Sequence, residues 1–272
     1  MAIAAVLVAS MAGSGNGYLL RVDLPRLAPM TALPVVEGSA GWPLVVIDPG
    51  HGGHDPGAAG SGFQEKDVVL GLAHSLKAEL EDAGGVRVAL TRADDRYLLH
   101  AERFEIARKL GAELFISLHA DSAGEGGGAG GASIYTLSNR ASSDAAARFA
   151  ARENASDMLN GVDLEQQSDA VGSLLVELAQ RRTSARSDEF AALVLREAEG
   201  KIAFHPQARR YAALKVLRAP DVPSILFESG FITNAADAER LTSPRGRAAF
   251  ASSLASAIRI YLATHAASEG AP

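Results

Sequence analysis

The pattern of apolar and polar positions divides the chain near residue 43. Residues 1–42 show no sustained periodicity and are interrupted by prolines, so we expect a leader and linker there. A dense apolar run at 44–47 is followed by Asp48 and a glycine-rich stretch, which predicts a buried strand ending in a loop. In residues 66–83 apolar side chains recur at spacings of three and four before Gly84 and Gly85, which predicts a helix and its end.

Strand-like and helix-like segments then alternate. We expect strands at 86–90, 114–118, 132–137, 214–217 and 224–227, and helices at 99–110, 144–155 and 245–264. Alternation of this kind is typical of an α/β fold with a mainly parallel sheet and helices on both faces. Residues 156–210 read as mostly helical and polar, so we expect no strand there but a helical insertion outside the sheet.

The first twelve residues leave the fate of the N-terminus open. They are apolar and rich in small side chains, and residues 10–15 could hold a signal cleavage site. A secretory signal normally opens with Lys or Arg, whereas the first basic residue here is Arg21. The segment could be a poor signal, the remnant of one, or a leader. It is too short to span a bilayer as a helix, so we expect no stable membrane span.

Composition removes several classes of function. The net charge of -6 comes without clustered Lys and Arg, so we expect no nucleic-acid partner. The chain has no cysteine, which excludes disulfides, cysteine metal ligands and cysteine nucleophiles. Its 272 residues and 47% apolar content suffice for a sizeable core.

Four polar residues stand where ligands gather in an α/β sheet, at or just beyond the ends of predicted elements. His51 lies in a glycine-rich turn after the first strand, and His119 ends an otherwise apolar strand. Glu65 lies just before a helix, and Glu228 closes the last apolar strand. Each has an ordinary structural explanation when taken alone: a turn, a helix-dipole partner, a satisfied core histidine or a salt bridge.

The four residues together predict a catalytic zinc site. Two histidines and one glutamate form a frequent catalytic zinc shell that leaves a fourth position open. Zinc lowers the pKa of water to about 7 and polarises a carbonyl oxygen. We therefore assign His51, Glu65 and His119 as metal ligands. Glu228 is left to carry a proton from the attacking water to the leaving nitrogen.

The chain resembles the zinc-dependent N-acetylmuramoyl-L-alanine amidases of the cell-separation type (the amidase 3 family). The likeness spans about 43–262 and rests on the order and spacing of these segments: 46–57, 65–66, 91–92, 117–121, 138–140, 153–154, 219–224 and 228–234. It implies a six-stranded sheet and the roles already given to His51, Glu65, His119 and Glu228. It also implies peptidoglycan as the substrate and a periplasmic location after export. We expect a monomer.

The resemblance further implies regulation by the insertion, which we place at about 153–210 within a catalytic domain of 43–266, followed by a tail at 267–272. In cell-division members a helical insertion covers the site and a glutamate from it can occupy the zinc. Glu153 matches a family glutamate at the start of the insertion, and Glu177 is the next candidate. An activator with a LytM-like domain at the division site would displace the insertion.

Two other functions remain compatible with the sequence. A cell-wall-binding module without catalysis could use the same groove, and a zinc peptidase or deacetylase could use the same residues on another amide. We expect structural or surface roles for the histidines outside the cluster, with His54 alone a candidate for a contact behind the ligands. Arg92 matches a family position, and we expect it to be structural.

Overall fold

The computed structural model describes residues 9–14, 17–22, 32–122, 129–157 and 170–269. For residues 9–14, 17–22, 170–182 and 266–269 only the backbone is described. The chain forms two compact units, Met1–Leu33 and Pro34–Pro272. The first carries an antiparallel hairpin of β1 (Ala9–Ser14) and β2 (Gly17–Val22), where we had expected no regular element.

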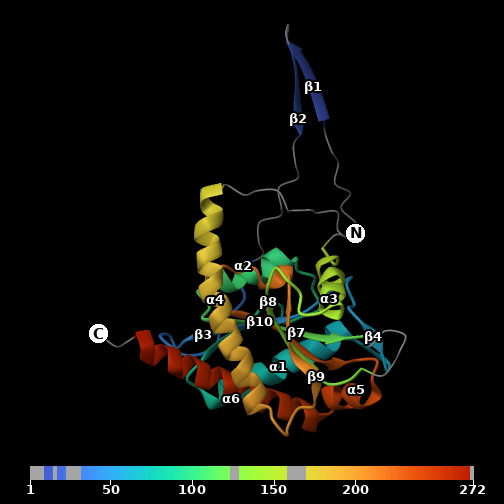
Figure 1. Ribbon diagram of the computed structural model, residues 1–272, viewed down its shortest axis with the longest axis vertical. Coiled ribbons are helices and arrows are strands. Elements are labelled where there is room, and N and C mark those ends of the chain that lie inside the picture. Colours follow the sequence, from blue (N-terminus) through green and yellow to red (C-terminus); the bar gives the residue numbers. More distant parts are fainter. Residues whose placement is uncertain (1–8, 15–16, 23–31, 123–128, 158–169, 270–272) are drawn as a thin grey trace. The chain divides into compact units, whose positions relative to one another are not determined.

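The second unit is built on one six-stranded sheet with the strand order β6-β3-β7-β10-β8-β9. Figure 1 shows this sheet with the helices around it. The strands β6 (Arg87–Leu90), β3 (Leu44–Pro49), β7 (Leu114–Asp121) and β10 (Ser224–Phe231) run parallel. β8 (Ala132–Leu137) is antiparallel to β10, and β9 (Phe204–Ala212) is parallel to β8. The predicted α/β class and the mainly parallel six-stranded sheet are confirmed.

Helices cover both faces of this sheet. α1 (Glu65–Ala83), α4 (Ala170–Glu197), α5 (Ala235–Thr242) and α6 (Pro244–Glu269) pack on one face, where they enclose the main apolar core. α2 (His100–Leu110), the short 3-10 helix η3 (Lys215–Leu217) and α3 (Asp144–Asn154) lie on the other. Within the described residues, no helix combines the length and apolar character needed to cross a bilayer.

The alternation of side chains along β7 explains where the polar residues point. Ile116 and Leu118 belong to the main core, so Ser117 and His119 face the opposite side. Glu228 of β10 is the register partner of His119 and therefore faces the same side. The site thus lies on the α2–α3 face, at the carboxyl ends of the parallel strands.

Two predictions for the second half of the chain are wrong. Residues 204–212 form β9, within the segment where we expected no strand. β9 is an edge strand, and its side chains are mostly exposed or half-buried. It also contains Pro206, so it lacks the continuous apolar run that is typical of a central strand. The predicted strand at 214–217 is instead η3, a turn of 3-10 helix.

The range 153–210 is consequently not an insertion separate from the sheet. Besides β9, it contains the second half of α4, from which Phe190 and Val194 are fully buried in the main core. We also did not predict α5, a helix of eight residues whose first turn is capped by the side chain of Asn234.

Candidate metal centre

The turn after β3 places His51 in an unusual backbone conformation. His51 has φ 57°, in the left-handed region that non-glycine residues seldom adopt. Buried arginines hold the turn by binding its carbonyl groups. Arg103 donates to the carbonyls of Pro49 and His51, and Arg92 donates to those of Pro49 and Gly50. These bonds offset the cost of the strained turn. Arg92 is fully buried and occupied in this way, as a structural role requires.

Asp48 stabilises the same turn through its contact with Arg103. Its carboxylate accepts hydrogen bonds from Thr91, Ser117 and Arg103 Nη1, the last at 2.9 Å. Complete burial by itself would raise the pKa of Asp48, but the Arg103 guanidinium and these hydrogen bonds outweigh it and hold the pKa below its ordinary value. The charged carboxylate is thus the stable form.

Glu65 is the first residue of α1, and backbone amides fix its side chain. Oε2 accepts from the amide of Ala58 at 2.8 Å, and Oε1 accepts from the amide of Ala120 at 2.9 Å. The small hairpin of β4 (Ala59–Gly60) and β5 (Phe63–Gln64) joins the His51 turn to the start of this helix. The helix-dipole explanation for Glu65 is therefore insufficient, because its carboxylate turns inward.

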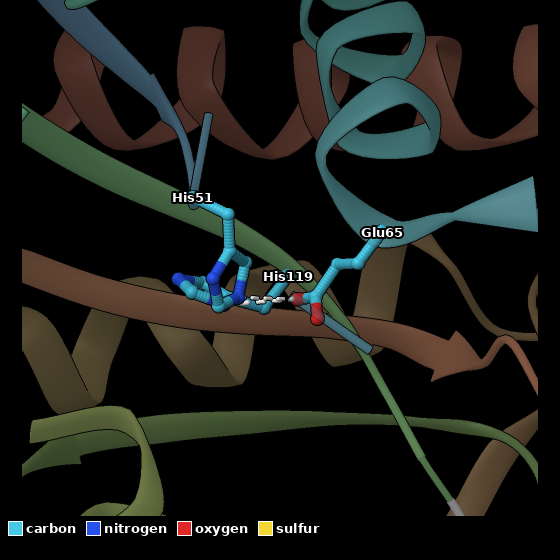
Figure 2. Close-up of side chains that lie close together, drawn as sticks. All are labelled: His51, Glu65 and His119. Carbon is cyan, nitrogen blue, oxygen red and sulfur yellow. Dashed lines mark hydrogen bonds and ion pairs between the residues drawn. The ribbon is translucent and has the colours of Figure 1, made fainter. Parts of the chain in front are cut away.

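His51, Glu65 and His119 converge, as Figure 2 shows. Their ligand-type atoms all lie within 4.8 Å of one another, and all three side chains are buried. Glu65 Oε1 lies 3.1 Å from His51 Nε2 and 3.1 Å from His119 Nδ1. His51 Nε2 is buried and makes no hydrogen bond within the described residues. The convergence that the sequence analysis required is therefore present.

Two glycines make room for this cluster. A Cβ on Gly50 would lie 2.4 Å from the His119 ring. One on Gly57 would lie 2.6 Å from Glu65 Oε2 and 2.7 Å from the His51 ring. Because real Cβ atoms do not approach so closely, only glycine at 50 and 57 leaves the three side chains where they are.

Electrostatics bind the cluster together. Burial disfavours a charged imidazolium, but Glu65 and Asp55 outweigh it and hold the pKa of His51 well above its usual value. Burial likewise opposes the charge of Glu65, yet His51 and His119 keep its pKa well below normal. Asp55 Oδ2 lies 2.9 Å from His51 Nδ1, which directs Nε2 toward Glu65. A carboxylate behind a histidine is a frequent feature of metal sites.

Glu228 lies beside the cluster, and its pKa is shifted in the opposite direction to that of Glu65. Its Oε2 accepts from the amide of Asp121 at 3.0 Å, whereas its buried Oε1 has no hydrogen-bond partner among the described residues. Burial raises the pKa of Glu228 well above its usual range, and the neighbouring carboxylates of Asp121 and Glu65 raise it further. Burial also raises the pKa of Asp121 to about 6. The raised pKa makes Glu228 a stronger base than an ordinary glutamate and lets it keep a proton to a higher pH.

The end of α3 lies over the cluster. Glu153 is buried, and its Oε2 lies 3.6 Å from His51 Nε2 and 3.4 Å from His119 Nδ1. The adjacent Arg152 pairs with Asp121. Glu177 belongs to α4, but its side chain lies outside the described part of the structure.

Two cavities open on either side of Arg152. One, of about 470 Å³, is lined by His51, Glu65 and Glu153 among others. The other, of about 290 Å³, is lined by Glu228 and by residues of β8 and α3. Arg152 lines both cavities, so the end of α3 separates the cluster side from the Glu228 side.

Two acids that were not predicted from the sequence, Asp55 and Asp121, complete the candidate site. Asp55 contacts His51, although we had considered its neighbour His54, which is exposed and lies against the Tyr97 ring. Asp121 faces both Glu228 and Arg152. Both acids lie within four residues of a predicted ligand, which could have marked them as candidates. The sequence alone does not show which acids near His51 and His119 point toward the site.

The fold and the cluster define a class of protein: an α/β protein with a candidate metal centre of two histidines and a glutamate at the carboxyl edge of its sheet. Comparison with known proteins identifies the family. Residues 45–259 match the family model described as N-acetylmuramoyl-L-alanine amidase, so the chain belongs to this family.

Individual relatives agree. The chain is 39% identical to the amidase AmiA of Escherichia coli K12 over 227 residues, which cover 83% of this chain and 76% of AmiA. It is 36% identical to AmiC of Escherichia coli O6:H1, with coverage of 89% of this chain and 58% of AmiC. Among solved structures, the amidase AmiC2 of Nostoc punctiforme aligns with a TM-score of 0.57 and 29% identity, covering 81% of this chain and 97% of that one.

The protein is therefore an enzyme that hydrolyses the amide bond between N-acetylmuramic acid and L-alanine, a bond of peptidoglycan. Members of this family are in general zinc enzymes.

Proposed function

We propose that this chain is a zinc-dependent, exported peptidoglycan amidase whose activity is restrained by the end of α3. His51, Glu65 and His119 would hold the zinc, and Glu228 would carry the proton. The main support for this proposal is that three side chains able to bind a metal lie buried side by side. A fourth acid, Glu228, lies next to them and has a raised pKa.

The residues fit a zinc ion. Two imidazoles and one carboxylate are a common catalytic zinc shell. His51 Nε2 is buried without a hydrogen-bond partner among the described residues, and the glycines at 50 and 57 leave space around the cluster. Asp55 fixes the orientation of the His51 ring from behind.

When bound, zinc supplies Lewis acidity and lowers the pKa of water. The chain's own contribution to the reaction is proton transfer by Glu228. Its carboxylate accepts a proton from the attacking water and returns it to the amine of the departing alanine. The raised pKa of Glu228 suits this exchange, because an ordinary glutamate would be too weak a base and too rarely protonated near neutral pH.

The test is digestion of isolated peptidoglycan followed by mass analysis of the released peptides. In a Glu153→Ala background, the enzyme should release stem peptides that begin with L-alanine. Glu228→Gln should lower the rate by about 10²–10⁴, the usual contribution of a general acid–base. The exposed Glu199→Gln is the matched control. Unchanged release by Glu228→Gln would remove this residue from the reaction, and products cleaved elsewhere would favour a peptidase or deacetylase.

Restraint by α3 is supported by the position of Glu153. Its carboxylate lies against the same two ring nitrogens that would bind the metal, and Arg152 separates the two cavities. A carboxylate at this place would compete with substrate for a metal held by these histidines. Activation then requires a partner that favours the displaced state of α3.

The cellular setting follows from the family likeness. We propose that the enzyme acts as a monomer in the periplasm, that it serves daughter-cell separation, and that its activator carries a LytM-like domain. The relatives AmiA and AmiC support a role in cell-wall cleavage. A solved amidase of Clostridioides difficile, CwlD, is in complex with a lipoprotein, GerS.

A further inference from the structure

The cavity on the Glu228 side is lined by more cations than acids. Three arginines and two acids line it, namely Arg148, Arg152, Arg210, Asp121 and Glu228. Arg152 and Asp121 pair with each other. The arginines outnumber the acids even when both acids are charged, so the lining of this recess carries a net positive charge.

Arg210, on β9, is the most deeply buried of the three arginines that line this recess. Its side chain is only 9% exposed, so its charge is largely removed from water. It donates to the Gln207 carbonyl at 3.0 Å, to the Tyr135 hydroxyl at 3.2 Å and to His205 Nδ1 at 2.9 Å. All three acceptors are neutral, and no carboxylate of the described residues forms an ion pair with Arg210. A buried guanidinium is costly unless an anion joins it.

His205 adds a second donor. Its Nδ1 accepts from both the Gln207 amide and Arg210, so the ring proton resides on Nε2. Partial burial and the neighbouring Arg210 lower the pKa of His205, which keeps the ring neutral in this tautomer. The Tyr135 hydroxyl accepts from Arg210, which leaves its own proton free to donate. Burial raises the pKa of Tyr135 to about 12, so this proton stays in place.

We propose that this recess binds a carboxylate of the stem peptide, with Arg210 as its cation and His205 and Tyr135 as further donors. The assignment rests on the proposed function in one respect. Glu228 returns a proton to the amine of the departing alanine, so the peptide side of the cut bond lies next to Glu228. The recess that Glu228 lines is then the place for the acidic residue that follows alanine.

The donors do not depend on α3. Tyr135 lies on β8, and His205 and Arg210 lie on β9, so all three are part of the sheet. α3 contributes Phe149, whose ring stacks on Tyr135 with centroids 4.5 Å apart. Displacement of α3 during activation would open the recess and carry Arg148 and Arg152 away with the helix, whereas Arg210, His205 and Tyr135 would stay in the sheet.

The test is equilibrium binding of two peptides to the full chain, measured by calorimetry. The first is L-alanyl-D-glutamate, and the second is its diamide, which keeps the shape and loses both carboxylates. We expect the diamide to bind about 10- to 100-fold more weakly, the usual range for losing charge-assisted hydrogen bonds. Arg210→Gln should weaken the acidic peptide to the level of the diamide.

Arg209→Gln is the matched control. Arg209 is the exposed neighbour on the same strand and pairs with Asp188, so this variant removes an equal charge outside the recess. It should leave the preference for the acidic peptide unchanged. Circular dichroism checks the fold of each variant. If Arg210→Gln does not fold, Tyr135→Phe replaces it and should weaken the acidic peptide several-fold.

Equal binding of the two peptides to the unaltered chain would overturn the proposal, and so would an undiminished preference in folded Arg210→Gln. Failure of the proposed function looks different. In that case the acidic peptide still binds preferentially, but peptidoglycan digestion in the Glu153→Ala background releases no peptide that begins with L-alanine.

Discussion

At the scale of single residues, the cluster of His51, Glu65 and His119 depends on charged side chains outside it. Arg92 and Arg103 are buried and donate to carbonyl groups of the His51 turn, and the buried Asp48 carboxylate accepts from Arg103. Buried charges of this kind are stable only while each keeps its partner. The turn therefore depends on Asp48 remaining charged.

Asp48→Asn should destabilise the protein by about 3–5 kcal/mol, because Arg103 then loses its buried counter-charge. The pKa of Asp48 is lower in the folded state than in the unfolded chain, where it is about 3.9. Its contribution is thus complete above that value and lost as pH falls through the folded-state pKa. Urea unfolding at neutral and acidic pH should show less acid sensitivity in Asp48→Asn than in the unaltered protein. An equal fall in both would contradict this role.

At the scale of elements, α3 is held over the site by contacts at its C-terminal end. The side chain of Asn154 donates to the Ala213 carbonyl and accepts from the Lys215 amide. Just beyond the helix, Asp157 accepts from the Tyr97 hydroxyl at 3.0 Å and pairs with His100 Nδ1 at 2.8 Å. The position of Glu153 over the cluster therefore depends on anchoring contacts that can be weakened separately from Glu153 itself.

Glu153→Ala and Asp157→Ala should both raise basal peptidoglycan hydrolysis. The first removes the competing carboxylate, and the second loosens its anchor at a cost of about 1–3 kcal/mol for the lost charged hydrogen bonds. Hydrogen exchange of α3 amides should accelerate in Asp157→Ala and change little in Glu153→Ala. Asp144→Ala, in the exposed first turn of the same helix, is the control. No gain in hydrolysis from folded Glu153→Ala would argue against autoinhibition.

The same elements limit how the restraint can be removed. Deleting the whole of 160–200 would take Phe190 and Val194 out of the main core, so loss of activity in such a variant would report on folding. Point variants at the end of α3 avoid this difficulty.

At the scale of the whole molecule, the metal should also stabilise the fold. Glu65, His51 and His119 come from a helix start, a loop and a strand, so a bound ion ties together segments that separate on unfolding. A ligand at about 1,000 times its Kd adds about 4 kcal/mol of stability. For a domain of this size that corresponds to roughly 8–16 °C in Tm.

Calorimetric scans with zinc and with a chelator would measure this effect. His119→Ala should abolish the shift, whereas the exposed His74→Ala should retain it. A Tm that is indifferent to zinc in the unaltered protein would contradict metal binding at this cluster.

The local pattern of apolar and polar residues was sufficient to predict much of this protein's fold. The apolar runs of β3, β7 and β10 and the helical spacing of α1 and α6 predicted the central sheet and its covering helices, because buried elements carry their periodicity in the sequence. Glycines and polar residues at the ends of predicted elements likewise predicted three side chains that the structure brings together, His51, Glu65 and His119, and the acid beside them, Glu228.

Only the tertiary structure decided the rest. β9 is an edge strand whose partner β8 lies far away in sequence, so its own residues carry almost no strand signal. The backbone strain at His51, the buried arginines behind it and the carboxylate of Glu153 against both histidines arise from contacts between distant segments. Such contacts depend on how elements pack, and no short stretch of sequence contains that information.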